Sequence, residues 1–164
     1  MHDVFDLGPV GVGNILLIMT VGMILGPPTY GQLSRKWVGK THGLIVFAVL
    51  VGAAACLLQA FLGPVGVGVA AVLLLLHGFL GSSATLNYAA SREAVAEHQI
   101  GRALTTINLA TFAGLFVLQG IAGLIIGQYE AGSPDGYRAM FVFLGVGLGV
   151  AGISFWFGAR RKKG

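Results

Sequence analysis

The chain has 164 residues, 55% of them hydrophobic and only 10% charged, with a mean hydropathy of +0.84. A water-soluble chain of this size could not bury so much apolar surface, because surface area falls too slowly with size, so an ordinary soluble domain is excluded. The pI near 9.6 would suit nucleic-acid binding, but the basic residues are spread over short segments between apolar runs, which membrane topology explains better than a nucleic-acid partner.

Charged residues divide the chain into long segments that contain no Asp, Glu, Lys or Arg: residues 7–34, 41–91, 103–129 and 139–159. A helix that crosses the bilayer core needs about 20 apolar residues. Three segments fit one span each, and the longest fits two, with Gly63-Pro64 near its middle as a turn signal. We therefore predict an all-α, polytopic membrane protein whose single transmembrane domain, residues 1–164, has five spans at residues 10–30, 42–62, 65–88, 103–128 and 139–159.

The first predicted span contains Pro27-Pro28 near its end, and we expect a kink or an early helix end there because two backbone donors are lost. The segment after this span, residues 31–40, reads GQLSRKWVGK. It resembles the cytoplasmic loop motif of the major facilitator superfamily, roughly G-x-L-a-D-r-x-G-r-k, at Gly31, Leu33, Arg35, Lys36, Gly39 and Lys40. Arg35 replaces the usual Asp and Gly39 lies one place late, as in the weaker copy of the motif between helices eight and nine, and both changes put the gating ion pair of the motif in doubt.

Two later segments carry the same resemblance. Residues 77–84, HGFLGSSA, are similar to the glycine-rich tenth helix of the family, and Gly101-Arg102-Ala103 followed by Thr105, Asn108 and Gly114 is similar to the start of its eleventh helix. The resemblance thus covers nearly the whole chain as helices eight to twelve, part of the C-terminal half. It implies a secondary active transporter of a small solute, with the substrate bound between two halves. The seventh helix and the N-terminal half would then be missing partners.

The span at 103–128 carries a polar stripe. At 100° per residue, Thr105, Asn108, Thr111 and Gln119 fall within a face about 120° wide. The stripe is a candidate lining for the substrate cavity. The alternative is that these side chains hydrogen-bond between helices, an interaction that contributes about 0.6 to 2 kcal/mol in membranes.

His77 is the titratable side chain well inside a span, and it shares a face with Tyr88. Histidine can change charge near physiological pH, so His77 is the candidate for proton coupling or substrate contact. The alternative is a packing histidine bonded to a backbone carbonyl. Asn14, Cys56 and Gln59 are isolated polar residues in their helices, for which packing is the preferred interpretation. Three glycine pairs have the GxxxG spacing of packed helices, Gly22/Gly26, Gly123/Gly127 and Gly145/Gly149, but a chain so rich in glycine also contains some such pairs by chance.

Basic residues predict the orientation. Every Lys and Arg except Arg138 falls on one side of the five-span scheme: Arg35, Lys36, Lys40, Arg92, Arg102, Arg160, Arg161, Lys162 and Lys163. Because short cytoplasmic loops are enriched in Lys and Arg, we predict a plasma-membrane protein with its N-terminus outside and its C-terminus in the cytoplasm. The basic tail should favour anionic lipid.

Two other classes of function remain. A membrane-embedded enzyme usually has clustered Asp, Glu or His at a membrane face, but no acidic residue lies in any predicted span, and Glu93, Glu97 and His98 fit a charged linker better than a metal site. We therefore expect no enzyme activity, cofactor or metal. A non-catalytic membrane subunit or a homodimeric half-transporter stays open as the alternative to a part of a transporter.

Overall fold

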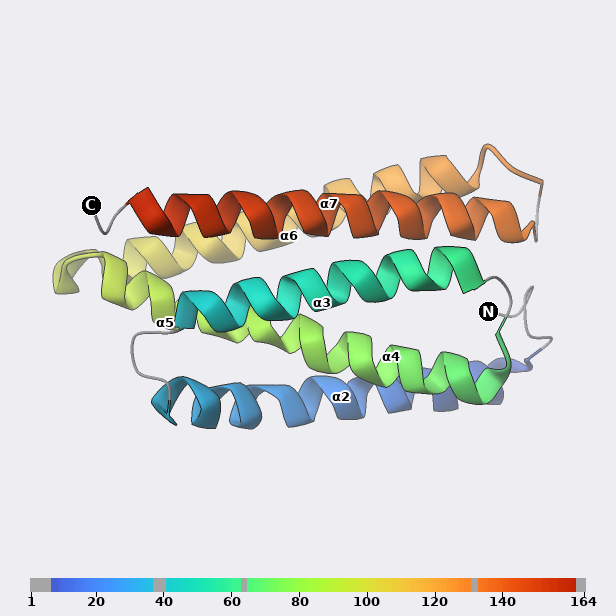
Figure 1. The fold of residues 1–164 in the computed structure, drawn as a ribbon, viewed down its shortest axis with the longest axis horizontal. Coiled ribbons are helices and arrows are strands. Elements are labelled where there is room, and N and C mark those ends of the chain that lie inside the picture. Colours follow the sequence, from blue (N-terminus) through green and yellow to red (C-terminus); the bar gives the residue numbers. More distant parts are fainter. Residues whose placement is uncertain (1–6, 37–40, 63–64, 131–132, 162–164) are drawn as a thin grey trace.

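The structure, a computed structural model, describes residues 7–36, 41–62, 65–130 and 133–161. All elements in this part of the chain are helical: α2 (Pro9–Lys36), α3 (Thr41–Leu62), α4 (Val67–Gly81), η1 (Ser82–Ala84), α5 (Thr85–Ala94), η2 (Glu97–Gln99), α6 (Ile100–Ile126) and α7 (Pro134–Arg161). Five stretches are long and apolar enough to cross a membrane, and these five confirm the expected all-helical, five-span fold. Figure 1 shows them side by side, with successive stretches running in opposite directions.

The helices extend beyond most of the predicted limits. The first runs from Pro9 to Lys36 and the last from Pro134 to Arg161, because a helix continues past its apolar core into residues that lie at the membrane surface. Of the two outcomes expected at Pro27-Pro28, the early end is wrong, since both prolines lie inside α2, and the kink stays a prediction. Residues 31–36 of the predicted loop motif are consequently the last turns of α2.

The third predicted span is not one continuous α-helix. It consists of α4, a 3-10 turn at Ser82–Ala84 and α5. The hydroxyl of Ser82 donates to the carbonyl of Phe79 (2.6 Å), and that of Thr85 donates to the carbonyl of Ser82 (2.9 Å). Such local side-chain bonds compete with the helical pattern and favour a change of geometry at this point.

Helix packing follows the glycines. α2 packs mainly on α4, and α3 mainly on α7. A Cβ atom added at Gly78 would lie 2.2 Å from the carbonyl oxygen of Met19, and one at Gly22 would lie 2.2 Å from that of Leu75. Because these glycines carry no side chain, the backbones of α2 and α4 come into direct contact.

The GxxxG pairs differ in how closely they approach other helices. Gly22 and Gly26 both lie against the α4–η1 segment, so this pair does mark helix packing. In contrast, Gly149 has open space around its Cβ direction, and Gly145 instead lies against Leu57 of α3. Gly123 also faces open space, so the Gly123/Gly127 pair makes no close contact with another described helix.

The buried core lies where α2, α3, α4 and α5 meet. It consists of Tyr30, Leu44, Ile45, Ala48, Leu80, Leu86 and Ala90. Tyr30 also packs against Phe79, with ring centroids 5.3 Å apart. None of the residues of α6 is buried, so this helix lies at the margin of the bundle.

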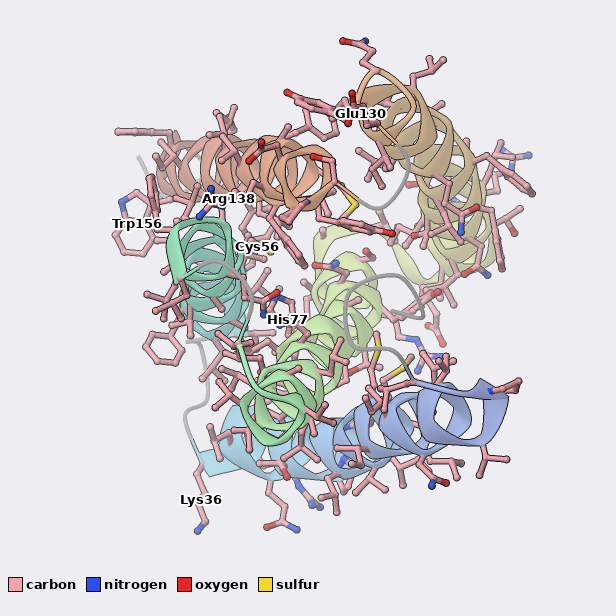
Figure 2. The ribbon with its side chains drawn as sticks, turned by 90° about the vertical axis from the view of Figure 1, so that its right-hand side faces the viewer. Lys36, Cys56, His77, Glu130, Arg138 and Trp156 are labelled. Atoms are coloured by element: carbon pink, nitrogen blue, oxygen red, sulfur yellow. The ribbon has the colours of Figure 1, made fainter. Side chains whose placement is uncertain are left out.

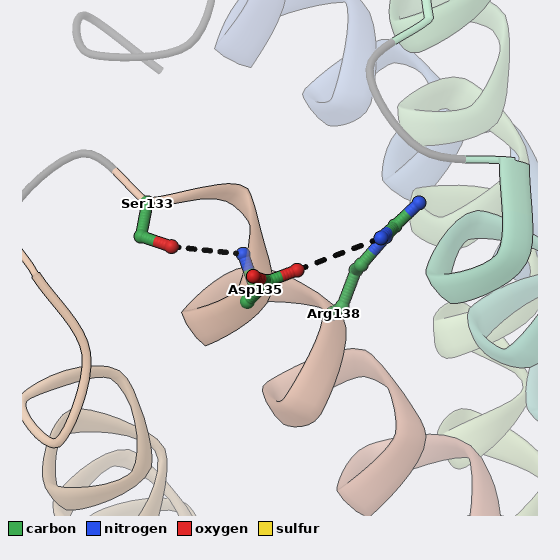
Figure 3. A network of polar contacts seen from close by, with 3 residues as sticks. All are labelled: Ser133, Asp135 and Arg138. Atoms are coloured by element: carbon green, nitrogen blue, oxygen red, sulfur yellow. Dashed lines mark hydrogen bonds and ion pairs between the residues drawn. The ribbon is translucent and has the colours of Figure 1, made fainter.

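The start of α7 is well capped (Figure 3). The hydroxyl oxygen of Ser133 accepts a hydrogen bond from the backbone N–H of Asp135 (3.3 Å), and Asp135 pairs with Arg138 (3.5 Å). A serine N-cap, a proline at the first helical position and an acid in the first turn all favour a helix start. They explain why α7 begins at Pro134, five residues before the predicted limit at Ala139.

Candidate functional site

The polar stripe lies on an exposed side of α6. Thr105, Asn108, Thr111 and Gln119 are all exposed on this chain. The stripe therefore does not pack into the core formed by the other helices. The four residues differ in their hydrogen-bond partners and neighbours.

Asn108 and Tyr88 are in direct contact. The Tyr88 hydroxyl donates a hydrogen bond to the side-chain oxygen of Asn108 and so connects α5 to α6. The structure thus brings together two candidate residues that the sequence placed on different helices. The remaining donors of the Asn108 amide make no hydrogen bond to other described residues.

The three other stripe residues differ in their hydrogen bonding. Thr105 donates to the carbonyl of Gly101 one turn earlier (2.9 Å), as threonines in helices often do. Thr111 makes no such bond within the described residues and instead lines a pocket between α3, α5, α6 and α7. Gln119 makes no hydrogen bond with the described residues either.

His77 lies in the interface between α3 and α4, not with the stripe. Figure 2 shows it beside Cys56. Its Nδ1 atom lies 2.8 Å from the carbonyl oxygen of Leu73, and its Nε2 atom lies 3.3 Å from the sulfur of Cys56. The amide nitrogen of Gln59 lies 3.4 Å from Nδ1. These contacts match the packing alternative, in which the ring is bonded to a backbone carbonyl.

These contacts define the protonation of the His77 ring. A carbonyl oxygen can only accept, so Nδ1 must carry the proton and donate to Leu73. In the neutral ring Nε2 is then an acceptor, and the thiol of Cys56 donates to it. With Nδ1 protonated, the Gln59 amide nitrogen cannot donate to it. The Gln59 amide is therefore assigned the flipped orientation, in which its oxygen accepts from the Nδ1 proton.

Sequence reasoning missed the partners of His77. Cys56 and Gln59 were interpreted as isolated packing residues, but both lie beside the histidine ring. Their spacing of three residues, which places them on one face of α3, was the available signal. Which face of α4 that pair would meet depends on helix packing and could not be predicted from the sequence.

The loop-motif residues lie at the end of α2. Leu33 packs against the core, whereas Gly31, Arg35 and Lys36 are exposed. The hydroxyls of Ser34 and Thr41 are 3.3 Å apart and connect the end of α2 to the start of α3. Gly39 and Lys40 lie outside the described residues.

The described residues contain no group of three or more His, Cys, Asp or Glu side chains that could hold a metal ion. Cys56 is a buried free thiol. What the arrangement offers chemically is hydrogen bonding by amides, hydroxyls and one imidazole.

A family comparison agrees with the helical architecture. The model of the family described as Major Facilitator Superfamily matches residues 1–164. A search of curated proteins finds no significant match. A search of solved structures finds none either.

Proposed function

The chain belongs to the major facilitator superfamily, and we propose that it forms the α6-lined wall of a solute pathway in a secondary active transporter. It is a multi-pass membrane protein of the facilitator type, whose members are transporters and not enzymes. The observation that carries the proposal is the polar stripe of α6, which the described helices leave exposed.

The stripe needs water, a solute or further protein around it. An amide in hydrocarbon without a hydrogen-bond partner is costly, and polar side chains inside spans therefore face a bundle interior or an aqueous cavity. Gln119 has no partner among the described residues, and the Asn108 amide still has free donors. A second helical half, in a longer chain or a separate one, would enclose the stripe and complete the pathway.

Within this pathway we assign substrate contact to Tyr88, Thr105, Asn108, Thr111 and Gln119. The Tyr88–Asn108 hydrogen bond fixes the side-chain oxygen of Asn108 and leaves its N–H groups for a solute. The substrate itself would be a small molecule that offers acceptors to these donors.

His77 is the residue we propose for proton coupling. A proton taken up by the neutral ring enters at Nε2, the atom that faces Cys56. The direction of this contact would then reverse, with Nε2–H donating to the Cys56 sulfur and the thiol hydrogen rotating away from the ring. The positive charge gained in the α3–α4 interface would favour a state in which His77 meets water or an acceptor, and would so connect protonation to the switch between states.

The motif at the end of α2 would act as the gate hinge. A Cβ atom added at Gly31 meets no atom of the described residues within 4 Å. In the transporter, Gly31→Leu should reduce the rate of transport more than substrate affinity, since it would obstruct the movement of the second half.

Transport in proteoliposomes tests the proposal. We expect saturable uptake of a labelled solute, increased by an inward proton gradient, when the chain is purified from its native membrane together with its second half. Liposomes holding residues 1–164 alone should show none. Absence of uptake from both preparations over a broad solute panel would support a non-catalytic subunit, and saturable uptake by the chain alone would support a homodimeric half-transporter.

A further inference from the structure

A pocket of about 550 Å³ lies between α3, α5, α6 and α7. It is found near the end of the bundle where α3 and α6 begin and α5 and α7 end (Figure 1). Binding sites for small molecules have about this volume, with a mostly apolar lining and a few polar groups. The lining here follows that pattern, with Ala90, Ile107 and Phe155 beside His42, Asn87, Ser91 and Thr111.

The amide and hydroxyl groups of the pocket carry no charge, and some of them make no hydrogen bond to the part of the chain that the structure describes. The side chains of Asn87 and Thr111 make no hydrogen bond within the described residues. Ser91 donates its proton to the backbone carbonyl of Asn87 (2.6 Å), so its oxygen remains an acceptor for a ligand. Among the residues that the structure describes, no Asp, Glu, Lys or Arg lines the pocket.

One wall is aromatic. The rings of His42 and Phe155 are nearly parallel, with an interplanar angle of 19° and centroids 5.5 Å apart. Both rings line the pocket. A flat ligand can therefore pack against an aromatic surface while its edge meets the polar groups of α5 and α6.

From these features we propose that the pocket binds an uncharged, planar heteroaromatic molecule with neighbouring hydrogen-bond donors and acceptors, such as a free nucleobase. An asparagine amide can bond in a bidentate manner to such an edge, as it does to adenine. A charged ligand is disfavoured, because the described lining holds no Asp, Glu, Lys or Arg to compensate the cost of removing its charge from water. Thr111 belongs to both the pocket and the α6 stripe, so the inference deepens the proposed function and rests on it for its role in transport.

Binding of adenine to the purified chain in lipid nanodiscs tests the pocket. We expect saturable binding that empty nanodiscs lack, and much weaker binding of adenosine monophosphate, which carries the same base with a charged phosphate. N6,N6-dimethyladenine, whose exocyclic amine has no N–H donor, should also bind more weakly. Equal binding of the phosphate compound or the dimethyl compound, or no saturable adenine binding, would overturn the proposal.

Variants separate a pocket effect from a folding effect. Thr111→Val and Asn87→Leu should each weaken adenine binding about three- to tenfold, the range expected for one lost hydrogen bond. Thr106→Val is the control for Thr111, because the Thr106 hydroxyl is bonded to the carbonyl of Arg102 and lies outside the pocket lining. Asn14→Leu, on α2, is the control for Asn87.

Phe155→Leu keeps an apolar side chain without the aromatic ring and should also weaken binding, which gives a second measurement if Asn87→Leu fails to fold. Equal affinity of the pocket variants and their controls would contradict the site. Solute transport without adenine binding would remove this inference and leave the proposed function standing, whereas adenine binding by a protein that never transports would support the pocket and contradict the proposed function.

Discussion

The hydroxyl of Tyr88 on α5 donates a hydrogen bond to the side-chain oxygen of Asn108 on α6. Because α6 has no buried residue, this bond is an important polar connection between that helix and the rest of the bundle. It also fixes which atoms of the Asn108 amide remain available to a solute. The contribution of this bond to stability can be measured directly.

A double-mutant cycle of Tyr88→Phe and Asn108→Leu should give a coupling free energy of about 1 kcal/mol, the usual net value of one such bond. Reversible unfolding of the purified protein provides the four stabilities. Tyr137→Phe is the matched control, since the Tyr137 hydroxyl makes no hydrogen bond within the described residues and should show no coupling to Asn108. A Tyr88–Asn108 coupling no larger than that of the control would contradict the contact.

The crossing of α2 and α4 should not tolerate a methyl group. Gly78→Ala places a Cβ 2.2 Å from the carbonyl oxygen of Met19, so the helices must separate, and we expect a loss of about 1 to 3 kcal/mol in unfolding free energy. Gly81→Ala on the same helix meets open space and should be neutral or stabilising, because alanine favours helix. Thermal unfolding in detergent of both variants checks this, and equal melting temperatures would refute the close crossing.

His77 should be locked in one tautomer. Its Nδ1 proton goes to the carbonyl of Leu73 and its Nε2 accepts from Cys56, so nitrogen NMR of histidine-labelled protein should show a protonated Nδ1 and an unprotonated Nε2. Cys56→Ala should shift the Nε2 signal, while Cys56→Ser, which keeps a donor, should shift it less. His42, exposed and without a hydrogen bond in the described residues, is the internal control and should show a mixture of tautomers. A proton on Nε2 of His77 would be incompatible with the network.

We predict the orientation of the chain in the membrane from its basic residues. Arg35 and Lys36 end α2, Arg92 lies near the end of α5 and Arg102 near the start of α6, and Figure 1 shows these helix ends at one end of the bundle. Arg138 lies near the start of α7, at the other end. Since short cytoplasmic loops carry most Lys and Arg, a reporter active only in the cytoplasm should work when fused to Gly164 and fail when fused to Met1. The reverse result would overturn the predicted topology.

The segments without Asp, Glu, Lys or Arg predicted the five spans, because charged side chains are costly in hydrocarbon. They could not predict where each helix begins and ends. The end of α2 at Lys36 lies beyond Pro27-Pro28, and a membrane helix can continue past a proline when neighbouring groups satisfy its free carbonyls. The start of α7 at Pro134 could have been predicted from the sequence Ser133-Pro134-Asp135, because these residue types favour a helix N-terminus.

The candidate site was predicted less completely than the fold. The periodicity of α6 grouped Asn108 with Thr111, but it could not show that one would bond to Tyr88 and the other would line a pocket. The contact of His77 with Cys56 and Gln59 likewise depends on how α3 and α4 are rotated against each other. Rotation of packed helices is determined by side chains on several elements at once, which one periodic pattern does not contain.

Water access along α6 tests the central claim most directly, namely that its polar stripe lines an aqueous solute pathway. Single cysteines would be introduced at Asn108 and Gln119, and at the exposed residues Val117 and Leu124 on the opposite face of α6, in a Cys56→Ser background, with the protein in its native membrane. A water-soluble maleimide should modify the cysteines at 108 and 119 rapidly and those at 117 and 124 slowly, because a thiol in hydrocarbon does not ionise. Equal rates on the two faces, or faster modification at 117 and 124, would contradict the pathway.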